Sequence, residues 1–199
     1  MEDLKLRVFY LKKKIIFPFC SLAVFLRPSE DSREIKKGDR LIALTIRSTL
    51  DLLFHRKRIA TLCEVVDVEI DDTMAKIMLK GIERVRIEKI IKRKHAIYTL
   101  LDQDHVEHHD SFIDELRKKS QELVFLINVD ESDRLIKMLN YIVDLDQMTD
   151  FISNYFIMDF GKRYRIYREV ELDKRSILLK ATLTRLIHSM NTRGKKKTA

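Results

Sequence analysis

Glycine, proline and tryptophan are scarce in this sequence, which has four glycines, two prolines and no tryptophan among 199 residues. A phosphate-binding loop of the Gly-x-x-x-x-Gly-Lys-Ser/Thr type needs two glycines at a fixed spacing. The four glycines lie too far apart to supply it: Gly38, Gly81, Gly161 and Gly194. The sequence also lacks a Gly-x-Ser-x-Gly nucleophile motif and a His-Glu-x-x-His zinc motif. These absences exclude a P-loop ATPase and leave no catalytic residue to nominate.

Cysteine is also rare, and long apolar runs are missing. Cys20 and Cys63 are too few for a disulfide framework and lack metal-site spacing, so we expect each to be a small buried hydrophobe. No apolar run approaches the roughly 20 residues that span a membrane. The first residues include Glu2 and Asp3 and do not resemble a secretory signal. We therefore expect a reduced, cytoplasmic protein that has no membrane contact.

Charge is plentiful and unevenly distributed. Charged residues make up 35% of the chain and the formal net charge is +8. Most of the basic excess lies in the first half, which includes the triplets 12–14 and 92–94. A basic surface attracts phosphates or acidic partners, but it is also compatible with simple solvation and with protection of strand edges.

The first half of the sequence has the period of two that is typical of strands. Apolar residues alternate over 6–11, and short apolar runs follow at 15–17, 22–26 and 40–46. Two longer runs, 59–70 and 74–91, flank the acidic pair Asp71-Asp72, which predicts a hairpin with a bend at Gly81. One more strand is expected over 95–101.

Beyond residue 110 the apolar period changes to three or four, which predicts helices. We expect them over 111–127, from 130 or 132 onward, and over 147–157, 162–170 and 173–190. The second should bury Leu135, Leu139, Ile142 and Val143, and the last Ile177, Ala181, Thr184 and Ile187. The predicted fold class is α+β, with a β-rich domain at 1–103, a polar linker at 104–110, a helical bundle at 111–190 and a basic tail at 191–199.

Two groups of side chains qualify as candidate binding residues. His105, His108 and His109 lie among carboxylates and could ligate a metal ion, although a polar linker that carries histidines explains them better. We therefore expect no metal and no cofactor. The second group comprises the aromatic residues of the N-terminal strands and a charged residue of the hairpin: Phe17, Phe19, Phe25 and Arg84. Where such aromatic side chains are exposed, they form a patch suited to unfolded polypeptide.

Five segments occur in a characteristic order. They are Val8–Leu11 with Ile16-Phe17-Pro18, Leu22–Leu26, Asp39–Leu44, Gly81–Ile87 and Leu172–Leu178. Together they resemble the N-terminal, substrate-binding domain of Lon proteases over nearly the whole chain. Three residues depart from the family pattern at usual glycine positions: Phe19, Ala60 and Thr73.

The resemblance implies a PUA-like β-barrel followed by a helical bundle, without the ATPase and peptidase domains of Lon. It leads us to expect a stand-alone, non-catalytic module that binds unfolded or extended polypeptide. Such a module could act as an adaptor or regulator of ATP-dependent proteolysis within a proteolytic complex. The alternative is an RNA- or nucleic-acid-binding module, because PUA-like barrels recur in RNA-binding proteins and the first half is basic.

Overall fold

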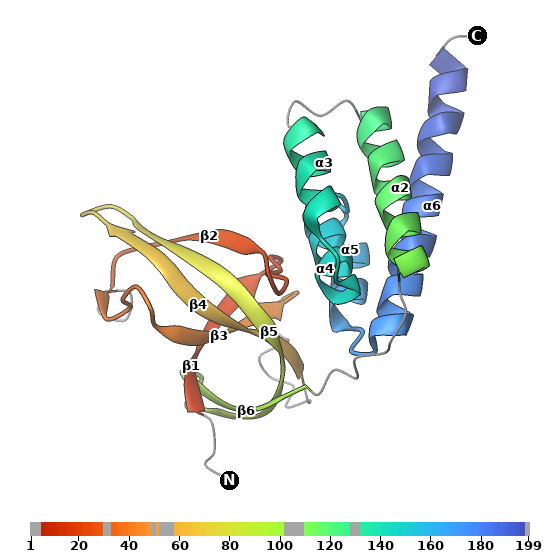
Figure 1. Cartoon of the computed structure of the whole chain (residues 1–199). Coiled ribbons are helices and arrows are strands. Elements are labelled where there is room, and N and C mark those ends of the chain that lie inside the picture. Colours follow the sequence, from red (N-terminus) through yellow and green to blue (C-terminus); the bar gives the residue numbers. More distant parts are fainter. Residues whose placement is uncertain are drawn as a thin grey trace. The chain divides into compact units, whose positions relative to one another are not determined.

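The structure is a computed structural model that describes residues 5–29, 33–48, 51, 58–101, 110–127 and 132–197, with side chains up to residue 192. The chain divides into two compact units, Met1–Asp102 and Gln103–Ala199. The first is β-rich and the second is helical, which confirms the predicted α+β class (Figure 1). Among the described helices, none combines the length and the apolar character that crossing a bilayer requires.

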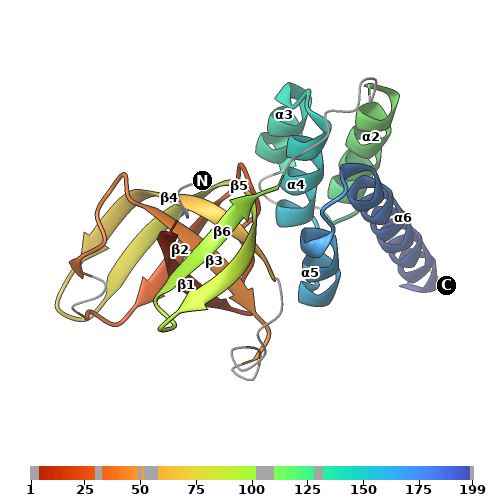
Figure 2. The same ribbon diagram turned by 90° about the horizontal axis from the view of Figure 1, so that it is seen from below.

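The described part of the β-rich unit contains six strands: β1 (Lys5–Lys12), β2 (Ser21–Leu26), β3 (Arg40–Ile46), β4 (Arg58–Ile70), β5 (Ala75–Ile91) and β6 (His95–Leu100). Five of these close a barrel, because β1 pairs with β3, β3 with β4, β4 with β5, β5 with β6, and β6 again with β1 (Figure 2). The β1–β3 pair is parallel and the others are antiparallel.

Strand β5 is long enough to belong to two structures. Its second half closes the barrel against β6, whereas its first half pairs with β2 and with the outer part of β4. The register between β4 and β5 shifts at Leu62/Cys63, opposite Gly81, which is the place where the sequence predicts a bend. The result is an arm of three strands, β2, β5 and β4, that continues from the barrel (Figure 1).

Because successive side chains of β1 point to opposite faces, this strand contributes to two separate hydrophobic cores. Val8 faces a cluster inside the barrel that includes Ile42, Leu62 and Val85, whereas Leu11 faces a second cluster that includes Val24, Ile77 and Leu79. A strand whose successive side chains point to opposite faces can connect two cores in this way.

The expected strand at 15–17 does not form, although Ile15, Ile16 and Phe17 are buried. Side-chain hydroxyls replace part of a strand ladder here: Thr45 Oγ1 donates to the carbonyl of Lys14 at 2.9 Å, and Thr61 Oγ1 donates to the carbonyl of Ile16 at 2.7 Å. An apolar run therefore marked burial correctly, but it did not mark a strand.

The described part of the helical unit contains α2 (Asp110–Ile127), α3 (Ser132–Tyr141), α4 (Leu145–Tyr155), α5 (Phe160–Arg168) and α6 (Leu172–Lys197). Two of these begin with an aspartate cap: Asp144 accepts from the Gln147 N–H, and Asp159 from the Lys162 N–H. Such caps satisfy backbone donors that have no partner within the helix. Helix α6 extends to Lys197, beyond the end at 190 that the sequence pattern predicts.

Three positions that we expected inside the helical unit lie on its surface: Val143, Ile177 and Thr184. Val143 is 80% exposed because it follows the end of α3, and Ile177 is 58% exposed. The buried stripe of α6 runs through Leu179, Leu183 and Ile187 at a spacing of four. The predicted stripe started from the wrong residue, since Arg175 and Ser176 occupy the buried side of the first turns.

A buried ion pair explains why Arg175 takes a core position. Its guanidinium is fully buried, pairs with Asp146 and lies 3.9 Å from Asp150. The same group donates to the carbonyls of Glu169 at 3.1 Å and Val170 at 2.9 Å. Arg175 thereby ties α4 and the end of α5 to the start of α6.

Candidate functional site

The residues around Pro18 form a tight turn that fixes the start of β2. The Cys20 N–H donates to the carbonyl of Phe17 at 3.2 Å, which places Pro18 and Phe19 at the two central positions of a β-turn. Phe19 has φ +62°. The third position of a type II turn requires a positive φ and normally takes glycine. Here an aromatic residue adopts the left-handed conformation, and its side chain is 47% exposed.

Gly81 holds this turn against the barrel. The Phe19 N–H donates to the Gly81 carbonyl at 2.9 Å, and the Gly81 N–H donates to the Cys20 carbonyl at 2.8 Å. A Cβ at position 81 would lie 2.3 Å from the carbonyl oxygen of Phe17, which is closer than any real contact. Only glycine allows the two backbones to approach this closely, so the position of Phe19 is set by main-chain contacts.

Strand β2 forms an edge of the arm. It pairs with β5 along one side, and among the described residues no strand pairs with its other side. Exposed edges usually carry charged residues or proline that prevent pairing with other chains. The segment from Cys20 to Leu26 carries neither.

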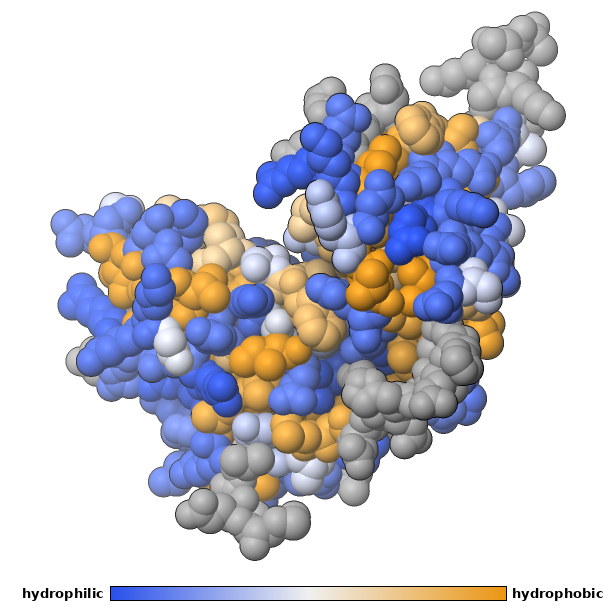
Figure 3. Space-filling model, in the orientation of Figure 1, coloured by the Kyte–Doolittle hydropathy of each residue, from blue (hydrophilic) through white to orange (hydrophobic). Residues whose placement is uncertain are grey.

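Exposed aromatic side chains lie near both ends of this edge. Phe19 precedes β2, and Phe25, near its far end, is 52% exposed. Phe25 pairs with Lys76, whose ammonium contacts Glu69 at 2.8 Å on the neighbouring strand. Apolar surface among hydrophilic side chains is visible over the β-rich unit in Figure 3. An extended chain that paired with β2 would therefore meet an aromatic ring at each end.

The other two predicted binding residues lie inside the β-rich unit. Phe17 is 0% exposed and Arg84 is 1% exposed. The Arg84 guanidinium lies 6.0 Å from the centre of the Phe17 ring, so the two side chains stack on each other. Neither side chain reaches the surface in this structure, so the exposed aromatic patch does not extend to them.

The three histidines that we considered as metal ligands, His105, His108 and His109, lie outside the described residues. Within the described ranges there is no group of three or more His, Cys, Asp or Glu side chains that could hold a metal ion. Cys20 and Cys63 are buried and are not joined in a disulfide. Burial raises the pKa of the Cys63 thiol well above its usual range, and such a thiol is not a nucleophile.

The sequence suggested Phe19 and Phe25 as candidate binding residues, but it did not indicate the strand edge between them. The signal was present, since the seven residues from Cys20 to Leu26 carry no charge in a chain that is 35% charged. It could not be interpreted from the sequence, because an uncharged run of this length fits a central strand equally well.

Two solved structures are similar in fold to this chain over most of its length. The N-terminal domain of Lon protease from Mycobacterium avium complex matches with a TM-score of 0.69 and 12% identity, covering 91% of this chain and 98% of that chain. A Lon N-terminal domain protein from Xanthomonas campestris matches with a TM-score of 0.60 and 12% identity, covering 89% and 98%. The fold is that of Lon N-terminal domains.

The family follows from the sequence itself. Residues 5–185 match the substrate-binding domain of ATP-dependent protease La (Lon), and the chain belongs to this family. No curated protein matches the chain. Membership of this family supports a role in substrate recognition.

Proposed function

We propose that this protein is a non-catalytic module that binds unfolded or extended polypeptide through the open edge of β2. The observation that carries the proposal is the uncharged, proline-free edge between the exposed rings of Phe19 and Phe25. Main-chain hydrogen bonds along a strand edge accept any sequence, whereas flanking rings select apolar side chains. Such a site suits substrates that share extended backbone and exposed apolar residues.

Membership of the Lon substrate-binding family supports the same function. A module of this kind can present polypeptides to a proteolytic complex, or compete with that complex for them. We therefore propose a role as an adaptor or regulator of ATP-dependent proteolysis.

The test is binding of unfolded casein, followed by fluorescence anisotropy at tens of micromolar protein. We expect binding of about −6 kcal/mol. Phe25→Lys places a charge beside the edge and removes a ring, and should weaken binding at least about tenfold, as expected for an aromatic anchor. Ile177→Lys makes the same change at a residue that is 58% exposed in the helical unit and should leave binding unchanged.

Absence of casein binding by the unaltered protein at these concentrations would contradict the proposal. Equal losses in the two lysine variants would show that β2 is not the binding edge.

A nucleic-acid module is the second function to test, and the observation in its favour is the row of three cations at Lys92, Arg93 and Lys94 in the turn between β5 and β6. The aromatic residues of the basic helix α5 do not strengthen the case for a nucleic-acid module. Phe160 stacks on Tyr164 at 5.6 Å, and Arg168 covers Tyr164 at 5.7 Å, so these rings are occupied. Capture of partners from a lysate with and without nuclease separates the two functions, because a nucleic-acid module loses its partners when nuclease is added.

A further inference from the structure

A hollow of about 490 Å³ lies at the far end of the β2 edge. It is lined by four consecutive residues of β1, by the turn between β5 and β6, and by three residues at and beyond the end of β2: Arg7, Val8, Phe9, Tyr10, Lys92, Arg93, Lys94, Leu26, Ser29 and Ile35. Leu26 is the last residue of β2 and also lines the hollow, so a chain paired with the whole of β2 would end beside the hollow.

The hollow exists because β1 lacks a partner strand over part of its length. On the β6 side β1 pairs only at Lys5–Arg7, and one further hydrogen bond runs from the Val8 N–H to the Lys94 carbonyl at 2.8 Å. Beyond Val8, no strand among the described residues pairs with β1 on the side that faces β6. Phe9 lies in this stretch of β1, where it is partly buried and packs against the core that includes Leu11 and Val24.

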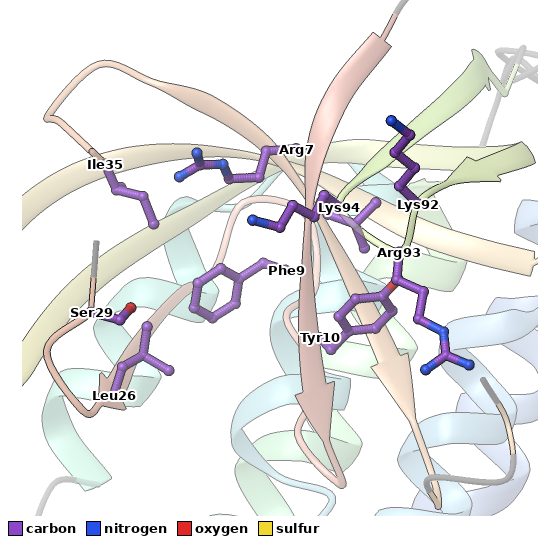
Figure 4. A pocket seen from close by; sticks show the side chains of 10 residues that line it. Arg7, Phe9, Tyr10, Leu26, Ser29, Ile35, Lys92, Arg93 and Lys94 are labelled. Atoms are coloured by element: carbon purple, nitrogen blue, oxygen red, sulfur yellow. The ribbon is translucent and has the colours of Figure 1, made fainter. Parts of the chain in front are cut away.

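The wall of the hollow is apolar on the side nearest β2. Figure 4 shows the ring of Phe9 directed toward Leu26, Ser29 and Ile35, which lie at the end of β2 and in the segment that follows it. Ile35 is 6% exposed and belongs to the same core as Leu11 and Val24. The apolar wall is therefore anchored in the fold and suits one apolar side chain.

The rim of the hollow is strongly basic. Arg7 and Lys94 extend over Phe9, while Lys92 and Arg93 lie on the other side of β1 beside Tyr10 (Figure 4). Among the described residues, the Glu34 carboxylate pairs with Arg7. Burial raises the pKa of the Tyr10 hydroxyl, and the nearby charges of Arg58 and Arg93 act in the opposite direction.

The turn that carries these cations is conformationally constrained. Lys92 has φ +47° and Arg93 has φ +57°, the left-handed region that residues with a Cβ rarely adopt. Three adjacent cations in such a turn repel each other, and an anion placed among them relieves that repulsion. Backbone strain of this kind persists where the surrounding structure holds it, often at binding sites.

We propose that the hollow binds the C-terminal residue of a polypeptide, with its apolar side chain against Phe9, Leu26 and Ile35 and its carboxylate among the basic side chains. This inference rests on the proposed function, because the bound chain reaches the hollow along β2. A C-terminal residue carries a carboxylate and a side chain on one Cα and has no onward chain to accommodate. Pockets of about 300–1,000 Å³ hold small ligands, and a hollow near the lower end of that range suits a chain end better than a continuing strand.

The experiment uses the full chain and fluorescent ten-residue peptides of alternating apolar sequence. One peptide ends in leucine with a free carboxylate, a second is the same sequence amidated, and a third is amidated with one internal glutamate. Hydrogen bonds to charged groups strengthen binding, so we expect the free acid to bind about tenfold more tightly than the amide. The glutamate peptide should bind like the amide.

A pair of matched variants locates the effect. The variant Lys92→Asn/Arg93→Asn/Lys94→Gln removes three charges while asparagine tolerates the left-handed backbone, and should abolish the preference for the free acid. The control Lys12→Gln/Lys13→Asn/Lys14→Gln removes three charges at another turn of the same unit, where Lys13 has φ +53°. It should retain the preference.

The outcomes separate this inference from the proposed function. If all peptides bind equally, edge binding stands and the hollow does not recognise a carboxylate. If the glutamate peptide equals the free acid, the hollow does not select chain ends. If no peptide binds, both proposals fail. A single-stranded RNA oligonucleotide that binds more tightly than any peptide, and loses binding in the 92–94 variant, would assign the hollow to nucleic acid.

Discussion

Phe19 combines a backbone conformation that suits glycine with an aromatic ring that is half exposed. Left-handed backbone costs a residue with a Cβ roughly 1–2 kcal/mol. Glycine would relieve this cost at φ +62°. A ring kept in this position at the expense of stability is the pattern expected of a binding residue.

Two substitutions at position 19 separate backbone strain from the ring. Phe19→Ala and Phe19→Gly both remove the ring, but only the second removes the strain. We expect Phe19→Gly to be about 1 kcal/mol more stable than Phe19→Ala in urea unfolding, while both lose polypeptide affinity equally. Equal stabilities would mean that the turn relaxes around the new residue, and a binding difference would mean that turn rigidity, not the ring, contributes to affinity.

Asp71 stabilises the hairpin that supports the arm. Its Oδ1 accepts from the Thr73 N–H, the Thr73 hydroxyl and the Met74 N–H, each at 2.7 Å. These hydrogen bonds, that of the Thr73 side chain first, lower the pKa of the Asp71 carboxyl. Because the pKa is lower in the folded state, the charged carboxylate stabilises the protein above its unfolded pKa of about 3.9. This stabilisation is lost as the pH falls through the folded pKa.

Asp71→Asn should therefore be less stable than the unaltered protein at neutral pH, and the difference should shrink as the pH falls below about 4. Urea unfolding at a series of pH values measures it. Asp72→Asn removes the same charge from the adjacent position and serves as the control. A difference between Asp71→Asn and the unaltered protein that does not change with pH would show that the charge of Asp71 is unimportant.

The residues of the candidate site were only partly predictable from the sequence. One sequence pattern, aromatic and basic residues among apolar ones, contains two residues that are exposed, Phe19 and Phe25, and two that are buried, Phe17 and Arg84. What separates them is burial, and the turn that places Phe19 at the surface is held by hydrogen bonds to Gly81, more than sixty residues later. Contacts of such range cannot be inferred from local periodicity.

Among the elements, α6 shows how one buried charge shifts the interpretation of a whole helix. The pattern 177, 181, 184, 187 has helical spacing, but the true stripe is displaced because Arg175 begins the buried side. Charged residues are almost never fully buried unless paired, and the partners Asp146 and Asp150 lie on another helix. The existence of α6 was predictable, whereas the side that it buries was not.

Removing this arginine should destabilise the helical unit strongly. Arg175→Met leaves two carboxylates without their counter-charge and two carbonyls without a donor, which should cost about 3–5 kcal/mol in urea unfolding followed by circular dichroism. Lys174→Met is the adjacent control, because Lys174 pairs with Glu171 at 2.7 Å on the surface, and it should cost less than about 1 kcal/mol. Adding Asp146→Asn and Asp150→Asn to Arg175→Met should restore part of the loss; no restoration would argue against a charge effect.

At the scale of the whole molecule, the sequence distinguishes a β-rich part from a helical part, but it does not predict how the strands of the β-rich part pair. The change from a period of two to a period of three or four predicted a β-rich part followed by a helical part, and the structure has both. Closure of the barrel was not predictable from periodicity, because it depends on the pairing of β1 with both β3 and β6. Neither was the hollow, since it lies where one of those pairings stops.

The pairing of β1 also sets the order in which this protein can fold during translation. Lys5 pairs with Ile97, 92 residues later, and its parallel neighbour β3 begins at Arg40. Synthesis proceeds at about 5–20 residues per second, so the first strand waits several seconds for the last strand of its barrel. During part of that interval β2, which carries no charge, has been synthesised but cannot yet pair with β5. A nascent chain of this protein is therefore a polypeptide of the type that its own finished edge would bind.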